Sequence, residues 1–227
     1  MPRRTRTGQC VYCAARGVVT SDHVPPKAFF PPKRRVNLLT VNACPTCHDG
    51  FKLDDEYFRV AISIRDDLPH GPDAQFLRDQ TKKTLRDPAA SRFRASILRA
   101  TTRVPTHTPA GLYLGHRVGL VVDGERLQRS ARRIIKALFA KRFNRVVPQT
   151  HQVDVSLFDL QRDQSAILHP DVQEILGILY ANGSHSNIGE VFEYWYGATD
   201  DELDTSVWFC RLHTAFEFVG WTTPRDA

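Results

Sequence analysis

The chain has 227 residues, of which 41% are hydrophobic and 25% are charged, and its formal net charge is +6. These fractions are ordinary for a globular protein and argue against wholesale disorder. A chain of this length can bury a core without disulfide bonds. No apolar run approaches the roughly 18 residues that a membrane-spanning helix needs. Gln9 and Cys10 stand where the hydrophobic region of a secretion signal would begin, so we expect a cytoplasmic protein.

Positive charge is concentrated in the first quarter of the chain. Residues 1–52 carry nine lysines and arginines against two acids, a net +7, whereas the remaining residues carry a net −1. A segment of this kind attracts polyanions, and the phosphate backbones of nucleic acids are the commonest polyanions in a cell. A solvated basic tail would give the same balance, so charge alone leaves both interpretations open.

Four of the five cysteines form two C-x2-C pairs in the same quarter, namely Cys10, Cys13, Cys44 and Cys47. Two such pairs predict one tetrahedral zinc ion held by four thiolates, at about 2.3 Å from each sulfur. A reducing compartment opposes the rival use of these thiols in disulfides. We therefore expect a structural Zn²⁺ on which the folding of the first fifty residues depends. Cys210 stands alone and is predicted to be a small buried hydrophobe.

The residues between and after the cysteine pairs predict two strands and a helix. Residues 18–23 and 37–43 are rich in Val and Leu and are joined by a basic, proline-rich loop, as expected of two short strands. Acids at residues 54–56 then stand at the start of an apolar segment, where the helix dipole favours negative charge. This order would bring the end of the first strand beside the start of the helix.

That arrangement can place Asp22 and His48 on one divalent cation, with His23 pointing into the same cleft. A carboxylate and an imidazole suit Mg²⁺, Mn²⁺ or Ni²⁺, and such an ion can neutralise charge on a phosphate and on its leaving oxygen. An unperturbed imidazole titrates near 6.5, so His23 suits a general base. The structural alternatives are a turn pair for Asp22 and His23, and a spare zinc ligand or hydrogen-bond donor for His48.

The chemistry-bearing residues arrive in the order Cys10-x2-Cys13, Asp22-His23, Asn37, Cys44-x2-Cys47-His48. In this order they resemble the zinc-containing branch of the HNH (ββα-metal) endonucleases, over about residues 8–60. The resemblance implies a zinc-clamped ββα-metal nuclease module, which we place at residues 1–66.

The resemblance also implies that Asn37 bridges the loop and orients the catalytic base. Asn42 is a competing asparagine, but Asn37 lies seven residues before Cys44, as in this family. A strand-entry cap is the structural alternative for Asn37. Many family members carry Asn where this chain has His48, and the imidazole can shift metal preference away from Mg²⁺.

Four cations are candidates for contact with a nucleic-acid backbone. Lys33, Arg34 and Arg35 lie in the loop between the two expected strands, and Lys52 lies four residues past His48. For Lys52, an ordinary surface lysine at a helix start is an equal alternative.

Residues 67–227 are less informative. A Gly- and Pro-containing stretch at 67–73 predicts a linker or turn, and residues 105–111 predict a loop. Periodicity predicts helices near 73–86, 89–103, 125–142 and 170–181, and strands at 118–122, 191–196, 206–212 and 215–221, the last three as an antiparallel meander. The aromatic residues of the meander are expected in its core, with base stacking as the alternative.

We therefore expect an α+β protein with an N-terminal nuclease module and an accessory region of mixed helices and antiparallel sheet. The accessory region would serve target recognition, dimerisation or nuclease restraint. The expected function is metal-dependent hydrolysis of DNA phosphodiester bonds, with RNA as a second substrate candidate and a bacterial or phage setting. Double-strand cutting with one site per protomer would need a homodimer, and no membrane partner is expected. The alternative is a zinc-stabilised nucleic-acid-binding regulator without catalysis.

Overall fold

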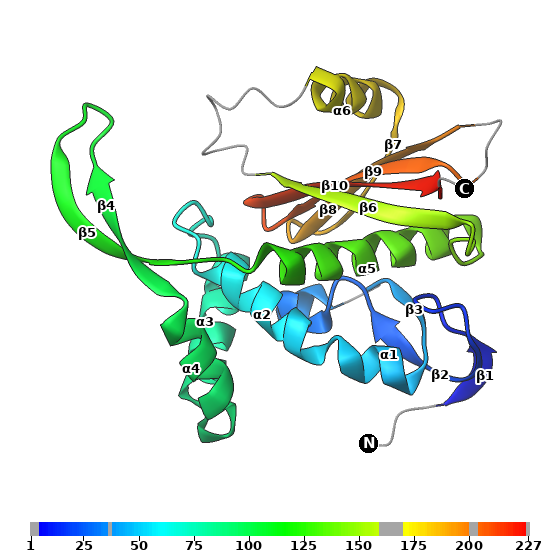
Figure 1. The fold of residues 1–227 in the computed structure, drawn as a ribbon, viewed down its shortest axis with the longest axis horizontal. Helices are drawn as coiled ribbons and strands as arrows, with labels where there is room; N and C mark the ends of the chain where they lie inside the picture. The colour runs from blue at the N-terminus through cyan, green and yellow to red at the C-terminus, as the bar shows by residue number, and fades with distance from the viewer. Residues whose placement is uncertain (1–4, 36–37, 159–169, 200–203, 226–227) are drawn as a thin grey trace.

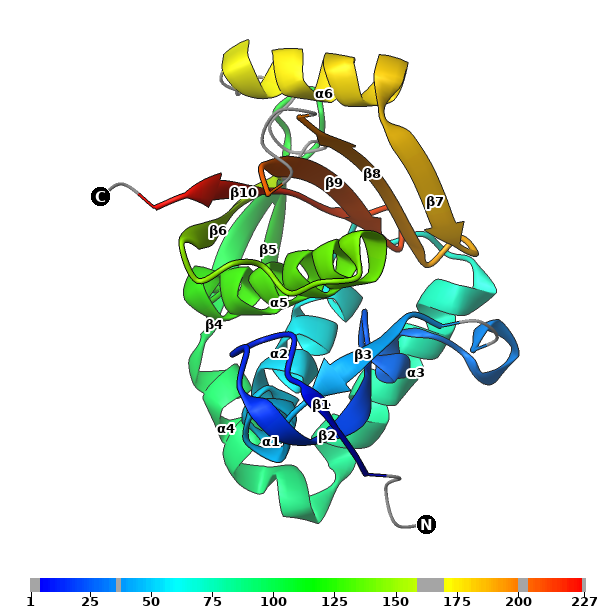
Figure 2. The same ribbon diagram turned by 90° about the vertical axis from the view of Figure 1, so that its right-hand side faces the viewer.

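The computed structural model describes residues 5–35, 38–158, 170–199 and 204–225. It is a mixed α+β fold with antiparallel sheets, as the sequence predicts. A five-stranded sheet lies on one side and the N-terminal strands with their helices lie on the other, and the long helix α5 (Gly124–Phe143) runs between them (Figures 1 and 2). Within the described ranges, no helix has both the length and the apolar character needed to cross a membrane.

The N-terminal part begins with a three-stranded antiparallel sheet of order β1-β2-β3, formed by β1 (Arg6–Gln9), β2 (Arg16–His23) and β3 (Thr40–Ala43). The 3-10 turns η1 (Lys27–Phe29) and η2 (Pro32–Arg34) lie in the loop between β2 and β3. Helices α1 (Pro45–Gly50) and α2 (Lys52–Ser63) follow.

These elements agree with the expected order of strand, loop, strand and helix. The strand expected at 18–23 is confirmed within β2, and the one expected at 37–43 is confirmed from Thr40 onward. Asn37 lies outside the described residues. The helix expected from residue 54 begins at Lys52, and the separate short helix α1 was not predicted.

The next segment contains α3 (Pro72–Arg86), the turn η3 (Pro88–Ala90), α4 (Ser91–Arg99) and a hairpin of β4 (Thr101–His107) and β5 (Tyr113–Leu120). The helix at 73–86 is confirmed. The helix predicted at 89–103 is confirmed over α4 and the loop predicted at 105–111 from residue 108 onward, but both predictions are wrong where β4 occupies Thr101–His107. Its β-branched Thr101, Thr102 and Val104 favour extended backbone. The hairpin projects away from the rest of the fold (Figure 1).

The large sheet is antiparallel with strand order β6-β10-β9-β8-β7. Its strands are β6 (His151–Phe158), β7 (Ser184–Ile188), β8 (Phe192–Ala198), β9 (Ser206–Leu212) and β10 (Phe216–Pro224). The predicted meander is confirmed as β8-β9-β10, whereas β6 and β7 at the two edges were not predicted. Helix α6 (Pro170–Asn182) lies on the face opposite α5, as Figure 2 shows.

Helix α5 is well specified by its own sequence. The Asp123 side chain accepts a hydrogen bond from the Arg126 backbone N–H at 3.2 Å, which caps the first turn. Asn144 ends the helix in the left-handed conformation, with φ 53°. The predicted apolar stripe is buried, and β10 approaches it closely at Gly220, where a Cβ would lie 2.4 Å from Ile135 Cγ1.

The hydrophobic core continues from the N-terminal part into the C-terminal part. One cluster of buried side chains includes Phe29 and Phe58 together with Ile134, Trp208 and Phe216. Helix α5 packs against α2 on one side and against β6 and β10 on the other. The boundary expected near residue 66 therefore lies within a shared core, and division into two domains stays a prediction. Cys210 is fully buried in β9, as expected.

The buried His213 makes the free energy of unfolding depend on pH. It lies in the β9–β10 turn, 3% exposed, with Nε2 donating to the Phe29 carbonyl oxygen at 3.2 Å. Burial lowers the pKa of His213 to about 4. The unfolded chain therefore binds more protons between about pH 6.5 and 4, and the free energy of unfolding falls as pH drops through that window.

We expect the contribution of His213 to this loss to be on the order of 3 kcal/mol. His213→Asn keeps a side chain that tolerates the local φ of 50° but does not titrate. Urea unfolding at pH 7 and pH 4 should show a smaller loss of stability in the variant than in the wild type. Equal losses in the two proteins would contradict this role.

Candidate functional site

The four N-terminal cysteines lie together. The Sγ atoms of Cys10, Cys13, Cys44 and Cys47 all lie within 4.8 Å of one another. The Cys13 and Cys44 sulfurs are 3.8 Å apart. Four sulfurs at about 2.3 Å from a tetrahedral zinc ion would be separated by about 3.8 Å. The cluster is close enough to hold one metal ion, and its dimensions fit zinc.

Local structure holds these thiols in place. Cys10 and Cys13 lie on the turn between β1 and β2, while Cys44 caps α1 and accepts a hydrogen bond from the Cys47 N–H at 3.5 Å. Burial opposes ionisation of Cys10, but backbone hydrogen bonds at Cys44, Cys13 and Tyr12 lower its pKa to about 7. Its thiolate, the form that binds metal, is therefore available near neutral pH.

Asp22 lies near the end of β2 with 5% of its surface exposed. Its Oδ2 accepts hydrogen bonds from the Tyr12 hydroxyl at 2.6 Å and from Arg133 Nη2 at 2.5 Å. Its Oδ1 lies 4.0 Å from His48 Nδ1. Two ligands at about 2.1 Å from one octahedral ion lie about 3.0 Å apart when adjacent and about 4.2 Å apart when opposite. The observed separation is close to the second value, so a small movement of either side chain would let the two atoms share a cation.

The two imidazoles are supplied by different elements. His48 lies in α1 directly after Cys47, and its Nδ1 is 3.2 Å from the Thr20 hydroxyl on β2. His23 ends β2 and is half-buried. Burial and the positive charge of Lys27 lower the pKa of His23, although Asp22 opposes the shift. His23 is therefore neutral at pH 7 and able to accept a proton.

Asp22, His23 and His48 border one cavity of about 430 Å³. The cavity is also lined by the cations Lys27, Lys52, Arg59 and Arg133 and by the acids Asp55 and Glu56. The structure thus brings together the three residues that the sequence placed in one cleft. A carboxylate, two imidazoles and several cations at one opening have the chemistry needed to bind and polarise an anionic group.

Arg133 connects this site to the centre of the fold. From α5 it donates to Asp22 through Nη2 and to Asp55 of α2 through Nη1. Its guanidinium also lies over the ring of Phe51, 4.8 Å from the centroid. Burial raises the pKa of Asp55 to about 6, against the lowering effect of Arg133. Burial also raises the pKa of Tyr12, so its hydroxyl remains a donor to Asp22.

The four cations predicted to contact a nucleic-acid backbone lie in different surroundings in the structure. Lys33 is exposed, and Lys52 borders the cavity while pairing with Asp49 at 2.8 Å. Arg34 Nε pairs with Asp73 at 3.1 Å, and Arg35 Nε donates to the Phe30 carbonyl at 2.9 Å. Arg34 therefore also ties the β2–β3 loop to α3, whereas the Arg35 bond lies within that loop.

Of the two asparagines considered for orienting the base, only Asn42 lies among the described residues. Asn42 Oδ1 accepts from Arg6 Nε at 3.0 Å, so its side chain serves the contact between β3 and β1. The role expected of Asn37 falls outside the described residues and stays a prediction.

Sequence reasoning missed Tyr12, Asp55 and Arg133 as parts of this site. Tyr12 stands between two cysteines of the cluster, and Asp55 belongs to an acidic run that local sequence explains as a helix start. Arg133 is 111 residues from Asp22 in sequence, so no local spacing joins them. The available signal was the composition of α5, which carries seven lysines and arginines and one acid.

Comparison with known proteins gives no relative to set beside this geometry. No family model, curated protein or solved structure matches the chain. The resemblance to HNH endonucleases therefore rests on the motif residues and their positions alone.

The ion pairs of Arg133 should stabilise the fold far more than those of its neighbour Arg129. Arg133→Met keeps an apolar stem but leaves Asp22 and Asp55 without their guanidinium partner, and we expect a loss of about 3–5 kcal/mol. Arg129 pairs with Asp54 at 2.9 Å, but its side chain is 46% exposed. Arg129→Met should cost about 1 kcal/mol or less. Chemical unfolding of both variants measures the difference, and similar losses would contradict the account.

Proposed function

We propose that this chain is a metal-dependent endonuclease that hydrolyses DNA phosphodiester bonds at an HNH-type, ββα-metal centre. The observation that carries the proposal is the convergence of Asp22, His23 and His48 on one cavity, with 4.0 Å between Asp22 Oδ1 and His48 Nδ1. A protein that only binds nucleic acid does not require this set of residues. The neighbouring cysteine cluster supports the two strands and the helix that carry it.

Two metal ions with separate tasks are proposed. Zn²⁺ is held by Cys10, Cys13, Cys44 and Cys47 and stabilises the fold. A second divalent cation, Mg²⁺, Mn²⁺ or Ni²⁺, is held by Asp22 and His48. When bound, this second ion supplies charge neutralisation at the scissile phosphate and its leaving oxygen.

The protein residues supply the remaining chemistry. His23 takes a proton from the attacking water, and its lowered pKa keeps it in the neutral form that this step needs. Lys27 and Lys52 border the same cavity and offer positive charge to the phosphate. Asn37 orients the base, as the resemblance implies.

One observation favours a second candidate function, a zinc-stabilised nucleic-acid-binding regulator without catalysis. Arg133 donates to Asp22 Oδ2 and neutralises part of the charge that would attract a cation. In this alternative, the ion pair between Asp22 and Arg133 is purely structural, and the cavity binds phosphate without cutting it.

A plasmid-cleavage assay separates the two candidates. We expect the purified wild-type protein to cut plasmid DNA with Mg²⁺, Mn²⁺ or Ni²⁺. His23→Ala should cut at least about 100-fold more slowly, the usual loss on removing a general base. Thermal unfolding and metal analysis should show that the variant remains folded and retains the metal of the cysteine cluster.

The control is His70→Ala, because His70 is exposed in the segment between α2 and α3. It should cut at the wild-type rate. Equal cutting by His23→Ala and the wild type would remove His23 from the mechanism. A wild-type protein that binds DNA but does not cut it with any of the three metal ions would favour the regulator.

A further inference from the structure

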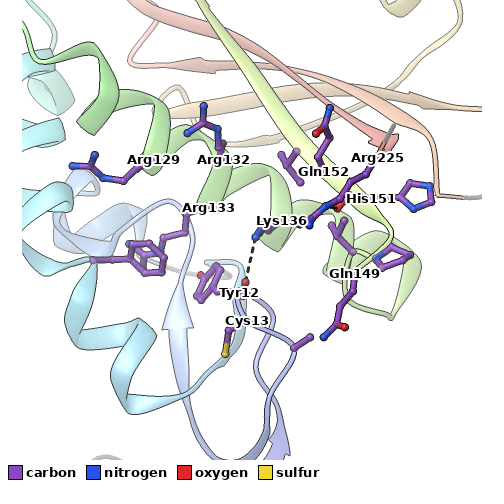
Figure 3. A pocket seen from close by; sticks show the side chains of 15 residues that line it. Tyr12, Cys13, Arg129, Arg132, Arg133, Lys136, Gln149, His151, Gln152 and Arg225 are labelled. Carbon is purple, nitrogen blue, oxygen red and sulfur yellow. Dashed lines mark hydrogen bonds between the residues drawn. The ribbon is translucent and has the colours of Figure 1, made fainter. Parts of the chain in front are cut away.

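A second and larger cavity has a volume of about 680 Å³. Arg133 lines both this cavity and the one described above, which shows that the two adjoin. We call the larger cavity the α5 groove. Its walls come from Arg129–Lys136 of α5, from Tyr12–Ala14 beside the first cysteine pair, and from residues 147–153 leading into β6 (Figure 3). Arg225, just after β10, completes the lining. Segments far apart in the sequence therefore build one concave surface.

The charged side chains that line the α5 groove are all positive. The described lining includes no carboxylate, and its five cations are Arg129, Arg132, Arg133, Lys136 and Arg225. Gln149, His151 and Gln152 add polar side chains. A concave surface lined by one sign of charge focuses the electric field and raises the local concentration of oppositely charged ligands.

Neighbouring carboxylates compensate only part of this charge. Arg129 pairs with Asp54, and Arg133 pairs with Asp22 and Asp55. The other three cations hydrogen-bond to neutral acceptors.

Arg132 Nη2 donates to Gln128 Oε1, Lys136 Nζ to the Tyr12 carbonyl and Arg225 Nε to the His151 carbonyl, each at 3.2 Å. Burial lowers the pKa of Lys136. Arg132 and Arg225 therefore keep the most positive charge for a ligand.

A solvated basic helix face does not account for this arrangement. Such a face would be convex and would be built from α5 alone. Here Arg225 and Arg132 come from different elements and line the same hollow (Figure 3). The charge of Arg225 also acts on Lys136 across the groove, and a bound anion would relieve this repulsion.

We propose that the α5 groove binds the phosphodiester backbone of DNA and leads it past Arg133 to the cavity of Asp22, His23 and His48. The C-terminal part would then hold the substrate, which gives the accessory region a role in binding. That DNA is the polyanion rests on the proposed function, whereas an anion site in the groove rests on its own charge and shape.

The test is binding of a fluorescein-labelled 20-base-pair DNA duplex, measured by anisotropy with the full metal-loaded chain at several salt concentrations. The His23→Ala background prevents cutting. In this background, Arg132→Gln with Arg225→Gln should weaken binding at least about 10-fold and reduce the slope of log K against log salt by about 2, since two phosphate contacts are lost.

The matched control is Lys82→Gln with Lys83→Gln, which removes the same charge from α3 outside the groove. It should bind like the background protein, and circular dichroism should show both double variants folded. Equal weakening by the two pairs, or unchanged binding by the groove pair, would overturn the proposal. No binding of DNA by the background protein would overturn it as well.

The same proteins separate this proposal from the nuclease assignment. If the wild type does not cleave plasmid but the groove pair alone loses DNA binding, the groove stands and the nuclease fails. If the wild type cleaves and the groove pair in the wild-type background binds and cleaves equally well, the nuclease stands and the groove fails.

Discussion

The buried ion pairs of Arg133 are the constraint on which the rest of the site depends. One guanidinium from α5 bridges the Asp22 carboxylate at the end of β2 and the Asp55 carboxylate on α2. Breaking such a buried pair by removing one partner leaves uncompensated charge in a low-dielectric environment, which costs several kcal/mol. The orientation of Asp22 toward His48 is therefore set by a helix that lies more than a hundred residues further along the chain.

The same helix joins the N-terminal part to the large sheet, since it packs against α2 as well as against β6 and β10. Helix α5 is buried on two sides: its apolar stripe packs against the large sheet, and Ser130, Arg133 and Ala137 are also buried. The cysteine cluster joins the turn before β2 to the start of α1, while Arg133 holds the end of β2 against α2. The four cysteines and the Arg133 ion pairs therefore lie at neighbouring points of β2 and of the helices that follow it.

The features that the sequence could predict are set by residues close to one another along the chain. The cysteine pairs, β2, α5 and the β8-β9-β10 meander follow from motifs or periodicities within a few residues of one another. The alternation of Val153, Val155 and Leu157 is typical of the strand found there, β6, and the β-branched residues after Arg99 favour a strand over the predicted helix. The basic composition of α5 was visible in the sequence, but the pairing of Arg133 with Asp22 and the addition of Arg225 to the groove depend on tertiary packing, so local spacing does not predict them.

We propose that Asp22 and His48 share a divalent cation beside the cysteine cluster. Crystals of the zinc-loaded protein soaked in MnCl₂ and measured at the manganese absorption edge test it directly. The account predicts an anomalous peak about 2.0–2.3 Å from both Asp22 Oδ1 and His48 Nδ1, absent from crystals of Asp22→Asn. A manganese-soaked wild-type crystal with no peak between these two atoms, and with Asp22 bound only by Tyr12 and Arg133, would contradict it.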